Sequence, residues 1–356
     1  MQDLKKETEP PYFLREKYSS PYTRKRISQR FHRRCKICRR HYVTRSHKSV
    51  FCSLKCRNIW LQLKQKRVLI IGSSGLVGSE LVKTLSEFYS LYPMTHKDLE
   101  VTSRTEVERV LKETKPHFVI NLSVCHTLEA EKDPFKAFLV NSIAVKDLSD
   151  FSRKFSFTLV HFSTDYVFSG KKGKPYFEDD TPGPVNVYGA SKLAGELFLQ
   201  HLAPSHYLVR TSSLFGSGRQ NFVTSMIEKV KRNERIEVVK DIRMAPTYSK
   251  DLAFQVQALM IFKKPFGLYH ITNSGECSWF EFAQEIFKIL DLSPKLFPIS
   301  IKDRKEPLKR PLYSVLASKK IRLRSWREAL EEFLTFEIGG ANDKGFERNP
   351  SSSKRR

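Results

Sequence analysis

The stretch from residue 66 to residue 86 constrains the fold more than any other part of the sequence. Val68 to Ile71 form a continuous apolar run, which is typical of a strand buried on both faces of a parallel sheet. Gly72, Gly75 and Gly78 follow at every third position, and apolar residues then recur at helical spacing. A strand, a glycine turn and a helix in this order present the first N–H groups of the helix to a pyrophosphate. We therefore expect an α/β fold with a doubly wound parallel sheet that binds a dinucleotide.

Strand and helix patterns alternate again after the glycine turn. Residues 117–123 and 157–163 are apolar runs with the length of buried strands, and a helical pattern from about residue 134 to residue 154 separates them. This alternation predicts right-handed crossovers between parallel strands. Because such sheets bind ligands beyond the carboxyl ends of their strands, the residues that follow each strand are the first candidates for a site.

Three polar residues lie at informative positions after the second of these runs. Thr164 follows the strand directly, and Tyr188 and Lys192 are four residues apart, which places them on one face of a helix. A neighbouring ammonium and a positive nicotinamide ring are expected to lower the pKa of a phenol from its usual value of about 10. A Tyr–Lys pair also occurs on helix surfaces without a function, so the upstream glycine turn is what favours catalysis here.

Short motifs recur in a fixed order along residues 66–332. They are GSSGLVG (72–78), NLS (121–123), STDYVF (163–168), VYGASKLAGE (187–196), VRTSSLFG (209–216), NFV (221–223), APTYSKDLA (245–253) and RPLYSVLASKKI (310–321). With these motifs the chain resembles the extended short-chain dehydrogenases and, within them, the branch of the dTDP-4-dehydrorhamnose reductases. The resemblance implies a Rossmann core with a small C-terminal substrate lobe.

The resemblance also implies an activity and a set of site residues. The implied reaction is hydride transfer from NAD(P)H to the keto carbon of a nucleotide-activated 4-keto-6-deoxy sugar. Tyr188 would donate the proton, Thr164 would hydrogen-bond the same oxygen, and Lys192 would orient the ribose. The implied cofactor contacts are Gly72, Ser74, Gly75, Leu76, Val77, Gly78, Glu100, Val101, Leu122, Ser123, Val124, Tyr188 and Lys192.

The choice between the two nicotinamide cofactors depends on the end of the second strand. A carboxylate about 20 residues after the first glycine would bind the ribose hydroxyls of NAD. Thr95, His96 and Lys97 come first in this chain, and hydroxyl and positive groups suit the 2′-phosphate of NADP. We expect NADP(H) over NAD(H), although Asp98 would reverse this choice if the strand ended later.

Three departures from the family pattern lie on the substrate side. Ser213 replaces a tryptophan, residues 241–247 differ from the D-Q-x-G-x-P-T stretch, and the loop at 125–134 is shorter. A non-catalytic alternative therefore stays open, because the regulatory subunit of methionine adenosyltransferase resembles the same branch and binds a nicotinamide cofactor without needing turnover. The retained threonine, tyrosine and lysine favour an enzyme.

Four of the six cysteines fall close together near the N-terminus. Cys35, Cys38, Cys52 and Cys56 form a C-x2-C pair and a C-x3-C pair separated by thirteen residues. Two thiolate pairs on tight turns can close a tetrahedron around Zn²⁺, and so short a module needs the metal to fold. Disulfides and an unbonded cluster are the alternatives. Because the end of the module resembles treble-clef zinc fingers, we expect a structural zinc module over residues 31–63.

The net charge of +25 is concentrated near the N-terminus. Residues 1–67 hold 20 Lys and Arg against 4 Asp and Glu. Such a surplus attracts phosphate-rich partners, so a nucleic-acid-binding protein that acts through the finger is a second alternative, and a protein partner of the finger also stays open. The basic arm (1–30) and the tail (338–356) are predicted to be disordered.

Membrane and export signals are missing from the sequence pattern. No apolar run reaches the roughly 18 residues that span a bilayer, and the first residues lack the apolar core of a signal peptide. We therefore expect a cytoplasmic protein without a membrane segment. The oligomeric state stays open, with a homodimer as one expectation.

Overall fold

The computed structural model describes residues 30–44, 46–304 and 308–339. Of the arm predicted at residues 1–30, residues 1–29 lie outside the described part of the chain. Of the tail predicted at residues 338–356, residues 340–356 lie outside it. None of the described helices combines the length and the apolar character that crossing a membrane requires.

The chain divides into two compact units, Met1–Asn58 and Ile59–Arg356. The division falls inside helix α1 (Leu54–Lys64), ahead of the predicted end of the zinc module at residue 63. Within the larger unit, the second half of α1 is attached through Trp60, whose indole N–H donates to the Glu87 carbonyl at 2.9 Å.

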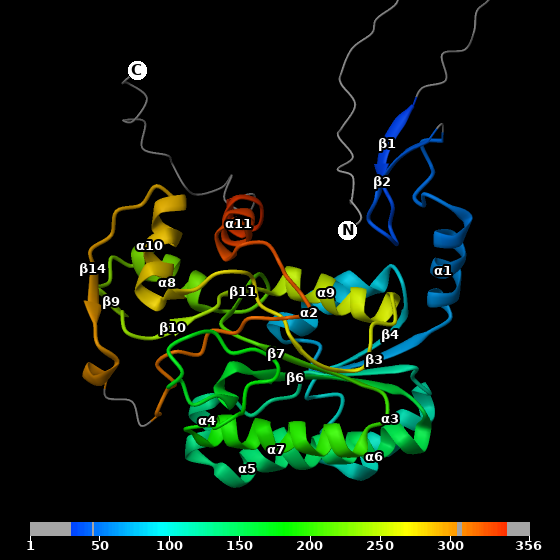
Figure 1. Cartoon of the computed structure of the whole chain (residues 1–356), viewed down its shortest axis with the longest axis horizontal. Coiled ribbons are helices and arrows are strands. Elements are labelled where there is room, and N and C mark those ends of the chain that lie inside the picture. The colour runs from blue at the N-terminus through cyan, green and yellow to red at the C-terminus, as the bar shows by residue number, and fades with distance from the viewer. Residues whose placement is uncertain (1–29, 45, 305–307, 340–356) are drawn as a thin grey trace, which may run out of the picture. The chain divides into compact units, whose positions relative to one another are not determined.

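The smaller unit is built on a two-stranded hairpin (Figure 1). Strands β1 (Phe31–Arg34) and β2 (His41–Thr44) pair antiparallel. Among the described residues of this unit, the buried apolar side chains are Cys35, Ile37 and Cys56. So small a core cannot stabilise an independent fold by apolar burial alone.

The larger unit contains a six-stranded parallel sheet in the order β12-β7-β6-β5-β3-β4. Its direction of winding changes between β3 and β5, which is the point where sheets of this kind bind ligands. The predicted α/β class with a parallel, Rossmann-like sheet is thereby confirmed. The strands are β3 (Arg67–Ile71), β4 (Ser90–Met94), β5 (Phe118–Asn121), β6 (Thr158–Thr164), β7 (His206–Thr211) and β12 (Gly267–His270).

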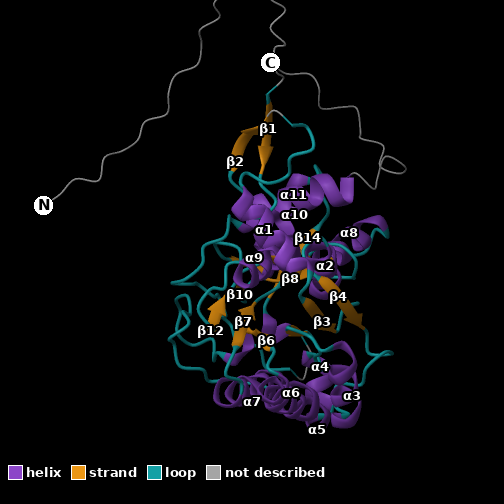
Figure 2. Ribbon diagram, turned by 90° about the vertical axis from the view of Figure 1, so that its right-hand side faces the viewer, coloured by secondary structure: helices purple, strands orange, loops and turns teal. Residues whose placement is uncertain are grey.

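Helices cover both faces of this sheet (Figures 1 and 2). Helices α2 (Leu76–Ser86) and α9 (Ser249–Ile261) pack together on one face. Helices α3 (Arg104–Thr114), α6 (Ala144–Phe155) and α7 (Val187–Leu202) cover the other. Apolar strand residues such as Leu69 and Leu159 are fully buried between the layers, as expected for strands covered on both faces.

The helix predicted from residue 134 to residue 154 is interrupted. Helix α4 (Thr127–Lys132) and the short α5 (Pro134–Phe138) are followed by a π-helical turn at Leu139–Ile143 before α6 begins. Asn141 in this turn accepts a hydrogen bond from Cys125 N at 2.9 Å and donates to Cys125 O at 3.0 Å. The π turn therefore aims one amide at the loop that follows β5, a use typical of π-bulges at functional sites.

The C-terminal lobe has its own core, in which Phe282 and Phe287 are buried and Phe280 is partly buried. Ser278 and Glu281 form a capping box that starts the helix at Trp279–Ile289. The last helical turn extends to Gly339, past the predicted domain end at residue 332. The elements of the lobe are β8 (Leu214–Phe215), α8 (Phe222–Lys231), β9 (Ile236–Val239), β10 (Arg243–Met244), β11 (Thr247–Tyr248), β13 (Cys277–Ser278), α10 (Trp279–Ile289), β14 (Leu296–Ile299), η3 (Ile301–Asp303), α11 (Trp326–Glu332) and η4 (Phe333–Gly339).

Candidate active site

The glycine turn after β3 leaves the N-terminus of α2 open. Gly72 has a φ of +83°, a left-handed conformation that glycine adopts without strain. A Cβ on Gly78 would lie 2.3 Å from the Gly72 carbonyl oxygen, so only glycine lets the helix pack this close to the turn. Helix α2 begins at Leu76, and its N-cap residue Gly75 provides no side-chain cap, which leaves the first N–H groups of the helix for a ligand.

A cavity of about 550 Å³ opens beside this turn. It is large enough for a substantial part of a dinucleotide and lies at the point where the sheet changes direction. The predicted residues that line it are Gly72, Gly75, Leu76, Val77, Gly78, Leu122, Ser123, Val124, Thr164, Tyr188 and Lys192. The three residues predicted to be catalytic thus share one cavity with the glycine turn.

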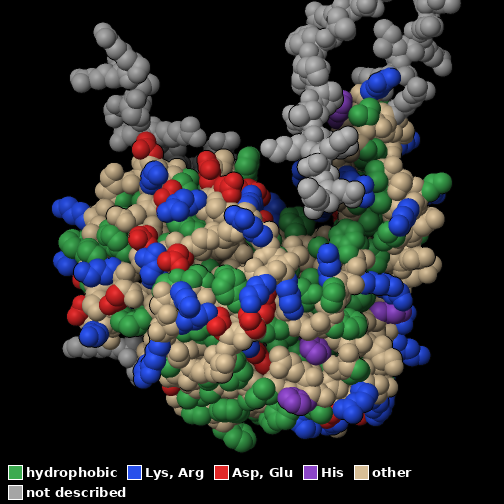
Figure 3. Space-filling model, viewed as in Figure 1, with side chains coloured by type: hydrophobic (Ala, Val, Ile, Leu, Met, Phe, Trp, Pro, Cys, Tyr) green, Lys and Arg blue, Asp and Glu red, His purple; other side chains and the backbone are tan. Residues whose placement is uncertain are grey.

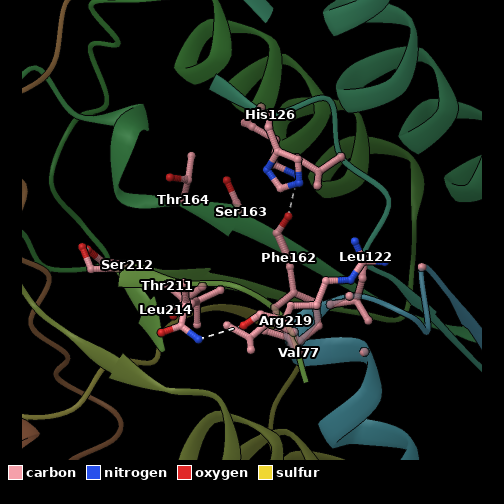
Figure 4. Close-up of a pocket in the computed structure, with 18 of the residues that line it drawn as sticks. Val77, Leu122, His126, Phe162, Ser163, Thr164, Thr211, Ser212, Leu214 and Arg219 are labelled. Carbon is pink, nitrogen blue, oxygen red and sulfur yellow. Dashed lines mark hydrogen bonds between the residues drawn. The ribbon is translucent and has the colours of Figure 1, made fainter. Parts of the chain in front are cut away.

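Thr164 ends strand β6, and its side chain stands beside Ser163 in the close-up (Figure 4). Its hydroxyl accepts from Tyr166 N and donates to Asp165 Oδ1, both at 3.1 Å. Asp165 begins the short 3₁₀ turn η2 (Asp165–Val167) and also accepts from the Ser314 hydroxyl at 2.5 Å. Burial raises the pKa of the Asp165 carboxyl to about 6, although these hydroxyl donors oppose the shift.

Tyr188 lies in the first turn of α7, and its ring meets that of Tyr166 edge to face at 5.8 Å. Burial raises the pKa of its phenol, and the hydrogen bond with Thr164 only partly opposes this. The lowering expected from an ammonium together with a nicotinamide ring stays a prediction, because desolvation is the largest influence among the protein's own groups. At neutral pH the phenol therefore carries its proton.

Lys192 lies one helical turn further along α7 and is buried, whereas Tyr188 is partly buried. Its Nζ donates to the Phe162 carbonyl at 2.6 Å. Burial lowers the pKa of Lys192 to about 8, and the charge of Glu196 opposes this only in part. Glu196 itself is paired with Arg210 at 2.6 Å inside the protein. Lys192 can therefore exchange its proton near physiological pH.

A chain of buried polar groups connects Lys192 with the loop after β5. Ser123 donates its hydroxyl hydrogen to Asn121 Oδ1 at 2.5 Å, and Asn121 Nδ2 lies 3.3 Å from His161 Nδ1. His161 Nε2 lies 3.4 Å from Lys192 Nζ. Burial holds the pKa of His161 well below its usual range, so the imidazole is neutral. These linked side chains hold the Lys192 ammonium in place at the wall of the cavity.

Three predicted cofactor contacts do not line the cavity. Val101 is buried in the core between the sheet and α3. The Glu100 carboxylate accepts from Thr102 N at 3.0 Å, which turns it back onto its own loop. Ser74 lies at the edge of the glycine turn, where its carbonyl accepts from Arg219 Nε at 2.8 Å. Core packing places Val101, a local turn hydrogen bond orients Glu100, and a contact with a distant loop lies at Ser74, and the motif reveals none of these.

Sequence reasoning missed several residues that line the cavity. Arg219, in the loop between β8 and α8, reaches across to the glycine turn (Figure 4). Ser163 and Thr211 also line the cavity, and their hydroxyls are buried without a partner among the described residues. Buried hydroxyls without partners are rare in folded proteins and mark positions that a ligand would satisfy.

The end of the second strand supports the expected cofactor choice. Strand β4 ends at Met94, so Thr95 is the first residue beyond it. Asp98, the residue that would have favoured NAD, accepts from Thr95 N at 2.8 Å and from the Thr95 hydroxyl at 2.7 Å. These hydrogen bonds lower the pKa of Asp98 and tie its carboxylate to the turn.

The four cysteines of the smaller unit come together as predicted. Their Sγ atoms all lie within 4.8 Å of one another, with Cys38–Cys52 at 3.4 Å and Cys52–Cys56 at 3.6 Å. A tetrahedron with metal–sulfur bonds of about 2.3 Å has edges of roughly 3.8 Å, which these spacings approach. All four thiols are free of disulfides.

The Cys35 thiol of this cluster has a lowered pKa, which favours its thiolate form. Burial raises the pKa of Cys35, but N–H donors from Cys52, Cys38 and Ile37 outweigh burial and bring this pKa to about 6. The donor from Cys52 lies 3.4 Å from the Cys35 sulfur. Backbone N–H groups aimed at sulfur favour the thiolate, which is the form that binds metal.

The fold and the cavity define a class of protein. A glycine turn at the switch point of a parallel sheet, facing a threonine, a tyrosine and a lysine, is the arrangement of the nicotinamide-dependent short-chain reductases. The chain belongs to the family described as the RmlD substrate binding domain, whose model matches residues 66–337. The branch expected from the motifs is thereby confirmed.

Relatives of known sequence and structure agree with this assignment. The chain is 35% identical over 275 residues to the spore coat polysaccharide biosynthesis protein SpsK of Bacillus subtilis, covering 75% of this chain and 96% of the relative. It is 35% identical over 280 residues to a dTDP-4-dehydrorhamnose reductase of Streptomyces griseus, covering 75% and 92%. The crystal structure of the Bacillus anthracis dTDP-4-dehydrorhamnose reductase in complex with NADP superposes with a TM-score of 0.73 at 36% identity, covering 76% and 99%. The cysteine module lies outside the matched family region.

Proposed function

We propose that this protein reduces the keto group of a nucleotide-activated 4-keto-6-deoxy sugar at the expense of NADPH. One observation carries the proposal: Thr164, Tyr188 and Lys192 line the same cavity as the glycine turn. Relatives that share about a third of their residues with this chain are named dTDP-4-dehydrorhamnose reductase and dTDP-4-keto-6-deoxy-D-glucose reductase.

The residues of the cavity fit a dinucleotide. The uncapped N-terminus of α2 and the guanidinium of Arg219 would bind the pyrophosphate, because both present donors to an anion. The hydroxyls of Ser163 and Thr211 would gain the partners that they lack within the described residues. Thr95 would lie toward the 2′-phosphate, since Asp98 is tied to its own turn. NADPH, when bound, supplies the hydride that reduces the keto carbon.

The protein's own groups handle the proton and the developing negative charge. Tyr188 holds a phenolic proton at neutral pH and donates it to the keto oxygen as that oxygen becomes an alkoxide. The Thr164 hydroxyl sits beside the phenol and stabilises the same oxygen. Lys192, whose pKa of about 8 lies near neutrality, then favours return of a proton to the phenolate.

A second cavity supports a nucleotide-linked substrate. It measures about 840 Å³ and lies in the C-terminal lobe. Its lining combines the aromatic ring of Trp279 with the cations Lys229, Arg235 and Arg304 and with the carboxylates of Glu237 and Asp303, and Arg235 pairs with Glu237 at 2.9 Å. An aromatic surface suits a base, and paired cations suit a diphosphate.

Despite the departures from the family pattern, Thr164, Tyr188 and Lys192 line one cavity. Asp241 accepts from Ile301 N at 2.8 Å, and Arg243 pairs with Glu276 at 2.8 Å, so both side chains act within the C-terminal lobe. Ser213 lines the cavity with a small side chain in place of a tryptophan. These placements favour an altered sugar preference over the non-catalytic, regulatory alternative.

The proposal is tested by incubating the purified protein with NADPH and a dTDP-4-keto-6-deoxyhexose. We expect NADPH oxidation that depends on the sugar nucleotide and disappears in Tyr188→Phe. Tight NADPH binding together with equal background rates for both proteins would instead identify a cofactor-binding regulator.

A second proposal concerns the cysteine module, which we infer holds one structural Zn²⁺ through Cys35, Cys38, Cys52 and Cys56. The spacing of the four sulfurs supports it, and so does the near absence of an apolar core among the described residues of this unit. Four protein ligands fill a tetrahedral shell, so such an ion would stabilise structure and leave no position for a substrate.

Metal analysis of the full-length protein tests this proposal. We expect one zinc per chain, and none in Cys35→Ser/Cys56→Ser. A metal-free wild type purified without chelator, or zinc retained by the double variant, would contradict it.

A further inference from the structure

The cysteine module carries a concentrated positive charge that the proposed reductase chemistry does not use. Between residues 30 and 58 the sequence has ten Lys and Arg and no Asp or Glu. The C-terminal lobe of the larger unit differs, because its Lys, Arg, Asp and Glu side chains are interspersed over α8, α10 and α11 (Figure 3). Acidic side chains on the lobe would therefore repel a polyanion. Residues 30–58 contain no acidic side chain that would do so.

The hairpin of the module has two different faces. Cross-strand pairing sets Arg33 opposite Tyr42, and this pair points toward the rest of the module. The Tyr42 hydroxyl donates to the Ser49 carbonyl at 2.8 Å, and Arg33 Nη2 donates to the His47 carbonyl at 3.1 Å. These contacts commit one face of the hairpin to internal packing.

The opposite face is exposed and basic. Side chains alternate along a strand, so His32 and Arg34 of β1 share a face with His41 and Val43 of β2. All four are exposed. Arg34 Nη2 lies 3.2 Å from His41 Nε2, which gathers the polar groups at the turn end of the hairpin.

The turn between the strands adds another cation at that end. Cys35 N donates to the Arg40 carbonyl at 2.9 Å, which closes the turn and leaves the Arg40 side chain exposed beside His41. Within the described residues, no carboxylate pairs with Arg34 or Arg40. We name His32, Arg34, Arg40, His41 and Val43 the hairpin face.

We propose that the hairpin face binds the sugar–phosphate backbone of a nucleic acid. Guanidinium groups are planar donors that match phosphate oxygens, and neutralised phosphates release counterions, which drives binding without apolar contact. The face presents a single apolar side chain, Val43, whereas the centre of a protein–protein interface is largely apolar and depleted of charge. This inference goes beyond the proposed reductase and rests on the proposed metal site only for the shape of the module.

The first experiment measures binding of the full-length protein to a fluorescent single-stranded RNA, a single-stranded DNA and a DNA duplex by anisotropy. We expect binding to at least one of them that weakens at least tenfold between about 50 mM and about 200 mM salt, as for proteins that contact several phosphates. Absence of binding at the lower salt concentration would overturn the proposal.

Charge reversal locates the surface. Arg34→Glu/Arg40→Glu should weaken binding at least tenfold at about 100 mM salt, because it replaces two contacts with two repulsions. The matched control is Arg109→Glu/Lys112→Glu on α3, an equal change of charge at side chains that are 58% and 62% exposed. We expect the control to bind within twofold of wild type, and equal losses in both variants would refute a specific face.

Zinc content and NADPH oxidation, measured on the same preparations, separate this proposal from the others. Arg34→Glu/Arg40→Glu should retain the zinc and the reductase rate of wild type while losing the nucleic acid. A wild-type protein that lacks metal yet binds nucleic acid would contradict the zinc proposal and leave the nucleic-acid proposal standing. Stronger binding to an acidic protein than to any of the three nucleic acids would replace the nucleic acid with a protein partner.

Discussion

The two units of this protein are stabilised in different ways. The larger unit buries continuous apolar strands such as Val68–Ile71 between two layers of helices. Among the described residues of the smaller unit, three apolar side chains are buried, and the packing around them is set by four sulfur atoms. In the first case the hydrophobic pattern determines the fold, and in the second we propose that a metal ion bound by the four cysteines takes its place.

The two units also differ in how they treat charge. The larger unit buries the Lys192 ammonium and the Glu196–Arg210 pair, and desolvation lowers the pKa of Lys192 there. The smaller unit exposes most of its described cations and has no acidic residue between residues 30 and 58. Buried charge suits proton transfer, whereas exposed charge suits the capture of an anionic partner.

The largest expected effect is the loss of the phenol in the larger unit. Tyr188→Phe should lower kcat about a thousandfold, because it removes the proton donor and keeps the ring packing. Steady-state NADPH oxidation measures this loss. The melting temperature, the NADPH affinity and the zinc content serve as controls, and a kcat within tenfold of wild type would show that another group donates the proton.

The next effect concerns the stability cost of burying Lys192. Burial lowers its pKa from 10.5 to about 8, so between these values the unfolded chain binds a proton that the folded chain does not. The free energy of unfolding should therefore rise with pH from 8 to 10, by at most about 3 kcal/mol. Denaturant titrations of wild type and Lys192→Met should show this rise only in wild type. Parallel pH profiles would mean that Lys192 is solvated.

A smaller effect is expected at Arg219, which sequence motifs did not single out. Arg219→Ala should raise the KM for NADPH about tenfold with kcat little changed, because a charge-assisted contact to a phosphate contributes about 1.5 kcal/mol or more. Arg219→Lys should recover part of the affinity. A lowered kcat at unchanged KM would assign Arg219 to the chemical step.

The smallest expected effect is that of zinc loss in the smaller unit on the rate of NADPH oxidation by the larger unit. Cys35→Ser/Cys56→Ser should abolish zinc binding and leave the rate of NADPH oxidation within twofold of wild type, since the reductase cavity is built from residues 72–221. The same preparation is measured by metal analysis and by kinetics. A reductase rate that falls with the zinc would show that the module supports the catalytic fold.

The parts of the fold that the sequence predicted are those with local repetition. Apolar periodicity located β3, β5 and β6 to within a few residues, and spacing alone placed Tyr188 and Lys192 on one helix. The π turn was missed because it depends on Asn141 reaching Cys125, a contact between separate segments.

Parts of the site depend on tertiary structure in the same way. Arg219 reaches the cavity through the loop between β8 and α8, whose course no motif fixes, and Thr211 ends strand β7 inside a motif that did not single it out. His161 was detectable only as a polar residue inside an apolar strand. The desolvation that raises the pKa of Tyr188 could not be predicted, because helical spacing reveals neighbours but not burial.

We propose that NADPH bound in the cavity beside the glycine turn transfers hydride to a sugar nucleotide, and that Tyr188 donates the proton. The most direct test supplies each stereoisomer of NADPH deuterated at C4 of the nicotinamide, together with a dTDP-4-keto-6-deoxyhexose, and analyses the sugar by mass spectrometry. We expect one stereoisomer of the deuterated NADPH to transfer a single deuterium to the sugar with the wild-type protein, and almost none with Tyr188→Phe. NADPH bound in the cavity with no deuterium reaching the sugar from either stereoisomer would contradict the account.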